Sequence, residues 1–259
     1  MSTKTEDGPS LVITQPMLMP WHGIFSQMSI ASRILIYDDV QLPYGRSFIT
    51  RVQIKTPKGT EWLSVPVQRS GQGKQRICDS LVGATDWRCR HLARIEQAYR
   101  RAPHFRTVFN DVVKPVYENQ SPRLVDFLVG SMARIAEVLG MPSSFELTSS
   151  GGFAEDFSGA ARIVEICRRT GTYGYLSGNG GMSYLDYDPF EEIGVRVYYM
   201  DYRLRPYPQL HGEFTPYVSL IDLLFCIGVE TAHEYLETVP IYWKDWPYQI
   251  DGRPVPSEA

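Results

Sequence analysis

One histidine and a pair of aspartates near the start of this chain are candidates for acid–base chemistry. His22 stands in the turn sequence Pro20-Trp21-His22-Gly23, and Asp38-Asp39 follows a short apolar run. A histidine whose pKa lies near neutrality can act as a general acid or base. A turn histidine held by structural hydrogen bonds has the same sequence signature. Both interpretations of His22 therefore stay open.

The two aspartates offer a second candidate base. On an extended segment, adjacent side chains point to opposite faces, so we expect only one of the pair to reach a shared site. We favour Asp39 for that role, because Gln41 would lie on the same face and could contact the same ligand. The alternative is that Asp38 and Asp39 form a turn or cap a helix.

Four other residues of this stretch are candidates for ligand binding. Gln15 ends the first apolar run and is costly to bury unpaired, so it either anchors the backbone or contacts a ligand. Trp21 either stacks on a substrate or packs in the core. Arg46 and Arg51 either hold a carboxylate or phosphate through paired hydrogen bonds, or form an ion pair with an aspartate.

A glycine-rich turn at residues 177–184, Ser-Gly-Asn-Gly-Gly-Met-Ser-Tyr, is the second candidate site. It follows an apolar run and precedes a predicted helix, where free backbone N–H groups and the helix dipole favour an anion. It has neither the Gly-Lys-Ser/Thr of a Walker loop nor the spacing of a dinucleotide fingerprint, so a plain turn is the alternative. The ligand contacts predicted here are Ser177, Gly178, Asn179, Ser183 and Tyr184.

Apolar runs at residues 11–13 and 34–37, with a helical pattern between them, predict a strand, a helix and a second strand. Alternation of strands and helices returns after residue 143. We therefore predict an α/β fold: a mainly parallel sheet with βαβ units, a β-hairpin near residues 52–67 and a helical insert near residues 86–140. The carboxyl ends of parallel strands gather at one sheet edge, where both candidate sites would meet.

The domain limits follow from composition at the two ends. Residues 1–10 and 251–259 are polar or rich in proline and read as disordered tails, which leaves residues 11–250 as a single domain. The insert carries an aromatic stripe at helical spacing, for which core packing is the favoured explanation.

Net charge, hydropathy and cysteine spacing exclude several classes of protein. The net charge of -3 and the absence of a basic run exclude a typical nucleic-acid binder. No stretch approaches the roughly 20 apolar residues that a membrane helix needs. The four cysteines lack the paired spacing of a zinc site or a disulfide framework, and no metal-ligand set is evident, so we expect a cytoplasmic protein without a metal.

Several motifs together resemble the WbqC-like protein family over about residues 11–230. They are QP-x3-PW-x-G-x-F at residues 15–25, Asp-Asp-Val-Gln at 38–41, Tyr-Leu-Ser-Gly at 175–178 and Phe-Thr-Pro-Tyr-Val-Ser-Leu-Ile-Asp-Leu-Leu-Phe at 214–225. The resemblance implies an enzyme of O-antigen or natural-product biosynthesis, with acyl or aminoacyl transfer, or acyl-bond cleavage, as the suspected chemistry. Some relatives carry a cysteine where this chain has Leu11, so a Cys–His nucleophilic pair is not available there.

The sequence leaves several functional classes open. Our first hypothesis is transfer of an acyl or aminoacyl group to an amine on an amino sugar or small intermediate, with His22 or Asp39 as base; an acyl hydrolase is its close variant. The hypothesis of nucleotidyl transfer is less favoured, because Ile24 stands where the P-x-H-x-G-H motif needs a histidine. A non-catalytic protein that binds a small ligand is a further alternative. The expected partner is a small-molecule substrate, carrier-protein-bound or nucleotide-linked; the sequence assigns no cofactor and no oligomeric state.

Overall fold

A computed structural model describes residues 8–256 except 46, 70–73, 85 and 203–204. Its centre is a six-stranded sheet of order β5-β2-β1-β6-β7-β8, in which every neighbouring pair is parallel except the antiparallel pair β7 and β8. The strands are β1 (Leu11–Thr14), β2 (Arg33–Ile36), β5 (Glu146–Leu147), β6 (Gly174–Leu176), β7 (Arg196–Met200) and β8 (Pro240–Tyr242). The predicted mainly parallel α/β fold is confirmed.

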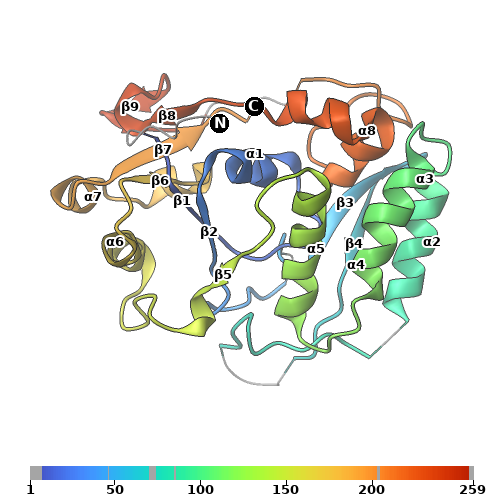
Figure 1. The fold of residues 1–259 in the computed structure, drawn as a ribbon, viewed down its shortest axis with the longest axis horizontal. Coiled ribbons are helices and arrows are strands. Elements are labelled where there is room, and N and C mark those ends of the chain that lie inside the picture. The colour runs from blue at the N-terminus through green and yellow to red at the C-terminus, as the bar shows by residue number, and fades with distance from the viewer. Residues whose placement is uncertain (1–7, 46, 70–73, 85, 203–204, 257–259) are drawn as a thin grey trace.

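Helices cover both faces of the sheet, which explains why its strands are nearly continuous apolar runs. Leu11 packs with residues of α6 (Gly159–Thr170) and α7 (Asp188–Glu192), whereas its neighbour Val12 packs on the opposite face near the end of α1 (His22–Ile30). Figure 1 shows α6 and α7 at the left of the view, and α8 (Leu220–Leu236) near the upper right. Helix α1 connects β1 to the parallel strand β2, so the predicted βαβ unit is present.

The predicted hairpin and helical insert are both present. The hairpin is the antiparallel pair β3 (Arg51–Thr56) and β4 (Gly59–Ser64). The insert consists of α2 (Trp87–Tyr99), α3 (Phe105–Val108), the π-helical η1 (Phe109–Val113), α4 (Lys114–Glu118) and α5 (Leu124–Val138).

Two elements are irregular. The strand β5 is only two residues long and leads into the short 3-10 helix η2 (Thr148–Ser150). The apolar pattern after residue 219 predicts two closing helices, near residues 219–227 and 231–238, and α8 does consist of two helical segments that meet at a kink at Gly228, whose φ of 81° only glycine adopts without strain.

Parts of both expected tails make contacts with the domain. Ser10 donates its backbone N–H to Gly174 O at 2.8 Å. Near the other end, β9 (Gln249–Ile250) pairs with β10 (Arg253–Pro254), and Trp246 Nε1 donates to Val255 O at 2.8 Å. Order therefore extends into residues 8–10 and 251–256, and residues 1–7 and 257–259 lie outside the described residues.

The described residues contain neither a membrane-spanning helix nor a cluster of metal ligands. None of the helices there is long and apolar enough to cross a membrane. No group of three or more histidine, cysteine, aspartate or glutamate side chains in the same part of the chain is arranged to hold a metal ion.

Candidate functional site

The chain changes direction across the sheet between β1 and β6. From β1 it continues to β2 on one side, and from β6 it continues to β7 on the other. In open α/β sheets, ligands bind outside the carboxyl ends of the strands at such a switch point. Gln15 follows β1 and Ser177 follows β6, so two predicted site residues flank this point.

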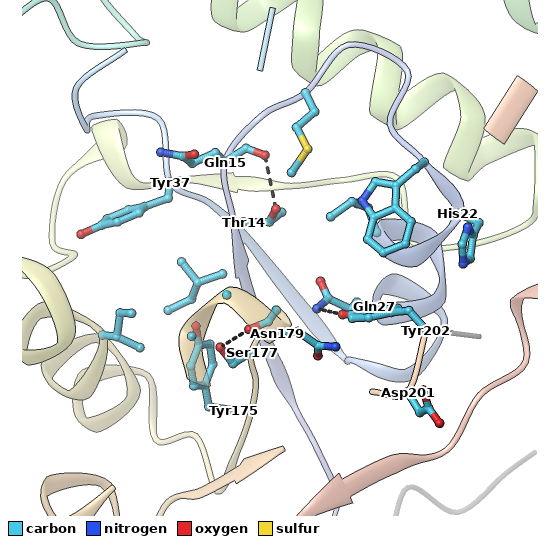
Figure 2. A pocket seen from close by; sticks show the side chains of 18 of the residues that line it. Thr14, Gln15, His22, Gln27, Tyr37, Tyr175, Ser177, Asn179, Asp201 and Tyr202 are labelled. Carbon is cyan, nitrogen blue, oxygen red and sulfur yellow. Dashed lines mark hydrogen bonds between the residues drawn. The ribbon is translucent and has the colours of Figure 1, made fainter. Parts of the chain in front are cut away.

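A cleft of about 1240 Å³ opens at this switch point (Figure 2). Four strand ends supply its wall: Tyr37 follows β2, Gln15 follows β1, Ser177 follows β6 and Tyr202 lies after β7. Gln27 Nε2 donates to Tyr202 Oη at 2.5 Å and thereby ties α1 to the segment after β7. We call this space the polar cleft, because neutral amides, hydroxyls and aromatic rings dominate its wall.

A second cleft of about 770 Å³ adjoins the first. The hairpin supplies Arg51 and Trp62 to its wall, and the preceding segment supplies Phe48. We call it the apolar cleft, since most of its wall is aliphatic or aromatic. Both clefts are lined by Gln15, Met17, Trp21 and Tyr217.

The turn that separates the clefts is held by distant helices. Met19 has a φ of 35°, which costs energy for a residue with a side chain. Its N–H donates to Ser131 Oγ of α5 at 3.1 Å, and its carbonyl accepts from Ser219 Oγ at 2.6 Å. Leu220 N–H donates to Pro20 O at 3.0 Å. The strained turn is therefore fixed by α5 and α8, which gives Trp21 a defined position.

Trp21 folds back over Gly23 at the start of α1. A Cβ at position 23 would lie 2.6 Å from the indole ring, so only glycine allows this arrangement. The indole also contacts the rings of His22 and Tyr202, at centroid distances of 4.7 and 5.1 Å. Trp21 is half-buried and lines both clefts, so it combines the packing and the ligand-facing positions that the sequence left as alternatives.

His22 lines the polar cleft but is only 5% exposed. Burial lowers its pKa from 6.5 to about 4, so its imidazole is neutral at physiological pH. Its Nδ1 is buried and has no hydrogen-bond partner among the described residues. Figure 2 shows His22 well apart from Ser177 and Asn179. A neutral imidazole can exchange a hydrogen bond with a ligand, but it is a weak general base.

The glycine-rich turn forms the short 3-10 helix η3 (Asn179–Ser183). Ser177 Oγ donates to Gly178 O at 3.1 Å, and Asn179 Oδ1 is buried without a partner in the described part of the chain. Ser183 donates its hydroxyl to Gly180 O at 2.8 Å and lies outside the cleft wall. Of the five contacts predicted here, the turn places Ser177, Gly178, Asn179 and Tyr184 along the polar cleft. An unpaired amide oxygen favours a ligand that donates a hydrogen bond.

Substitution of Gly181 by alanine should disturb the polar cleft selectively. A Cβ at Gly181 would lie 2.3 Å from Ser177 Oγ, whereas a Cβ at Gly180 meets nothing within 4 Å. We expect Gly181→Ala to lose about 1–3 kcal/mol of unfolding free energy through overpacking. We expect Gly180→Ala to stay within about 0.5 kcal/mol of the wild type. Urea unfolding of both variants measures this; equal losses would mean that Ser177 does not restrict the turn.

Asp39 forms a buried ion pair instead of facing either cleft. Arg162 Nη1 and Nη2 lie 3.1 and 2.6 Å from its two carboxylate oxygens, and both side chains are 6% exposed. Burial acts to raise the pKa of Asp39, but hydrogen bonds from Arg162 and Thr148 and the charge of Arg162 outweigh burial and lower it. Asp39 therefore ties β2 to α6 and lines neither cleft, where a base would have to meet the substrate.

Asp38 and Asp39 also converge, contrary to the expectation of opposite faces. The chain leaves the extended conformation after β2, and Thr148 Oγ1 lies 3.1 Å from Asp38 Oδ1 and 2.7 Å from Asp39 Oδ1. Ser149 donates its N–H and its hydroxyl to Asp38 at 2.9 and 2.6 Å. The pair thus holds the segment after β5, and Asp38 is completely buried.

The other three residues predicted to contact a ligand do not lie together. Gln41 is exposed, forms a β-bridge with Arg76 and lines neither cleft. Arg46 lies outside the described residues. Arg51 lines the apolar cleft, with its guanidinium carbon 3.9 Å from the centre of the Trp62 ring.

Sequence reasoning missed two residues of the polar cleft and the buried partner of Asp39. Asp201 and Tyr202 follow β7, so the rule that ligands bind at strand ends would have found them. Arg162 carried a different signal, because it lies next to Ile163 and four residues before Ile166 in a helix of apolar periodicity. A charged residue on that face indicates a buried partner.

Comparisons with known proteins agree with the motifs. The sequence model of the WbqC-like protein family matches residues 15–234. The chain is 35% identical over 228 residues to the "Uncharacterized protein Rv1507c" of Mycobacterium tuberculosis (strain ATCC 25618 / H37Rv), which covers 87% of this chain and 96% of that relative. No solved structure matches.

Proposed function

The chain belongs to the WbqC-like protein family, and we propose that it is an enzyme that transfers an acyl or aminoacyl group to an amine of a polar small molecule. The observation that supports it is the pair of adjoining clefts with different chemistry, which share the wall formed by Gln15, Met17, Trp21 and Tyr217. The polar cleft would hold the acceptor, and the apolar cleft the acyl donor. The shared wall would be the place where the two substrates meet.

The polar cleft suits an acceptor that donates hydrogen bonds. Asn179 presents a buried amide oxygen without a partner in the described chain, and the carboxylate of Asp201 lines the same wall. Tyrosine rings such as Tyr184, which is 58% exposed, offer flat surfaces for stacking. An amine or hydroxyl group on a compact polar molecule matches these groups.

Transfer would proceed by direct attack. The amine nitrogen of the acceptor forms a bond to the carbonyl carbon of the donor, the bond from that carbon to the leaving group breaks, and the amine proton passes to the leaving group. Among the described residues, neither cleft wall contains a cysteine, and the buried Ser177 bonds to a backbone carbonyl rather than to a histidine. Rate enhancement would come from holding both substrates in position, which is worth about 7–11 kcal/mol in well-oriented reactions.

A non-catalytic binding protein is the second candidate, and one observation favours it. His22 is the only imidazole along either cleft in the described part of the chain, and its pKa of about 4 makes it a weak base. Such a protein would bind the same ligands without turnover.

Simultaneous binding tests the two-substrate proposal. We expect acyl thioesters and small amines each to raise the melting temperature, and the two together to raise it further than either alone at saturation. Phe48→Ala, in the exposed wall of the apolar cleft, should weaken only the thioester, and Asn179→Ala should weaken only the amine. Competition between the two ligand classes would contradict separate sites.

A further inference from the structure

The apolar cleft contains an arginine fixed on an aromatic ring. Arg51 and Trp62 are diagonal neighbours on the hairpin, since Arg51 pairs with Ser64 and Gln53 pairs with Trp62. Diagonal neighbours on the same face of a hairpin are within reach of long side chains. The guanidinium carbon lies 3.9 Å from the Trp62 ring centre, and Phe48 packs on Trp62 with a centroid distance of 5.9 Å. The contact with the Trp62 ring therefore holds the guanidinium in this cleft.

The guanidinium of Arg51 has an unsatisfied donor. Its Nε is buried and finds no hydrogen-bond partner among the described residues. A buried donor without an acceptor is unfavourable, so an incoming hydrogen-bond acceptor is favoured. Arg51 is also the one charged residue along this cleft in the described chain, and no carboxylate there competes for it.

We propose that the apolar cleft is a binding site for an apolar or aromatic molecule that carries one carboxylate, which pairs with the Nε edge of Arg51. A planar guanidinium matches a planar carboxylate through two parallel hydrogen bonds. A phosphate group carries more charge and is usually met by several cationic or backbone donors, whereas this wall offers a single guanidinium. The walls contributed by Phe48, Trp62 and Val218 would enclose the apolar part of the ligand.

If the apolar cleft holds the acyl donor, the transferred acyl group carries a free carboxylate besides the carbonyl that reacts. This consequence rests on the proposed function, but the binding site itself does not.

Calorimetric titration of the whole chain with matched probes tests the site. Benzoate and benzamide have nearly the same shape, and only benzoate is charged. We expect benzoate to bind about tenfold or more tightly than benzamide, because hydrogen bonds to a charged group contribute more than neutral ones. Phenyl phosphate should bind no better than benzoate. Since no turnover is measured, failure of the proposed transfer leaves this result unaffected.

Substitutions of Arg51 test whether its guanidinium is the group that prefers the carboxylate. Arg51→Gln should bind benzoate and benzamide about equally, Arg51→Lys should keep part of the preference, and Arg90→Gln, an exposed arginine on α2, should behave as the wild type. The wild-type comparison needs no variant to fold. Equal binding of benzoate and benzamide by the wild type, binding of neither, or a clear preference for phenyl phosphate would each overturn the proposal.

Discussion

Replacement of Arg162 by methionine should cost about 3–5 kcal/mol of unfolding free energy at pH 7. The substitution keeps a long side chain but leaves the Asp39 carboxylate buried without its counter-ion. Breaking one side of a buried pair is costly because the remaining charge has neither water nor a counter-ion. Urea unfolding monitored by tryptophan fluorescence gives the value.

A matched pair on the surface controls for the general effect of losing an arginine. Arg33 forms the same two-bonded contact with Glu146, at 2.6 and 2.7 Å, but their side chains are 36% and 47% exposed. Arg33→Met should cost no more than about 1 kcal/mol. Similar losses in the two variants would show that burial of the Asp39–Arg162 pair adds nothing, and Asp39→Asn combined with Arg162→Met should recover part of the larger loss.

Acidification from pH 7 to pH 4 should destabilise the fold through two buried histidines. Burial lowers the pKa of both His22 and His91 from 6.5 to about 4. The two histidines are therefore protonated near pH 6.5 in the unfolded chain, but only near pH 4 in the folded chain. The free energy of unfolding falls as the pH is lowered through this window, by about 3 kcal/mol for each histidine.

Single substitutions separate the two contributions. His22→Gln and His91→Gln should each remove about half of the decline between pH 6.5 and pH 4, while His233→Gln, on the exposed side of α8, should leave the decline unchanged. The lowered pKa of Asp39 acts at lower pH, because its contribution is lost only below the ordinary aspartate range. A pH profile of urea midpoints that is flat down to pH 4.5 would contradict buried, neutral histidines.

The sequence predicted the parts of the fold that depend on local periodicity. Residues 11–13 and 34–37 are apolar enough to mark β1 and β2, and the carboxyl-end rule then brought Gln15 and Ser177 to one edge. The role of Asp39 could not be predicted in this way. Its partner Arg162 lies 123 residues further along the chain, and no local pattern connects the two.

The apolar cleft escaped prediction for a similar reason. Arg51 was recognised as an anion-binding candidate, but its setting depends on Trp62 across the hairpin and on how the hairpin packs against the turn at Trp21. The role of His22 was also not predictable from its residue type. Its type indicated acid–base chemistry, whereas its burial, which the sequence does not report, lowers its pKa far below neutrality.

The most direct test of the two-cleft account is mass spectrometry of reaction mixtures that contain the protein, an acyl thioester with a free carboxylate and a panel of small amines. The account predicts an amide product whose mass equals the acyl group plus the amine less one hydrogen, formed more slowly by Phe48→Ala and by Asn179→Ala. Release of free acid alone would indicate a hydrolase. Absence of any product, although thioester and amine bind together, would contradict transfer and favour the binding protein.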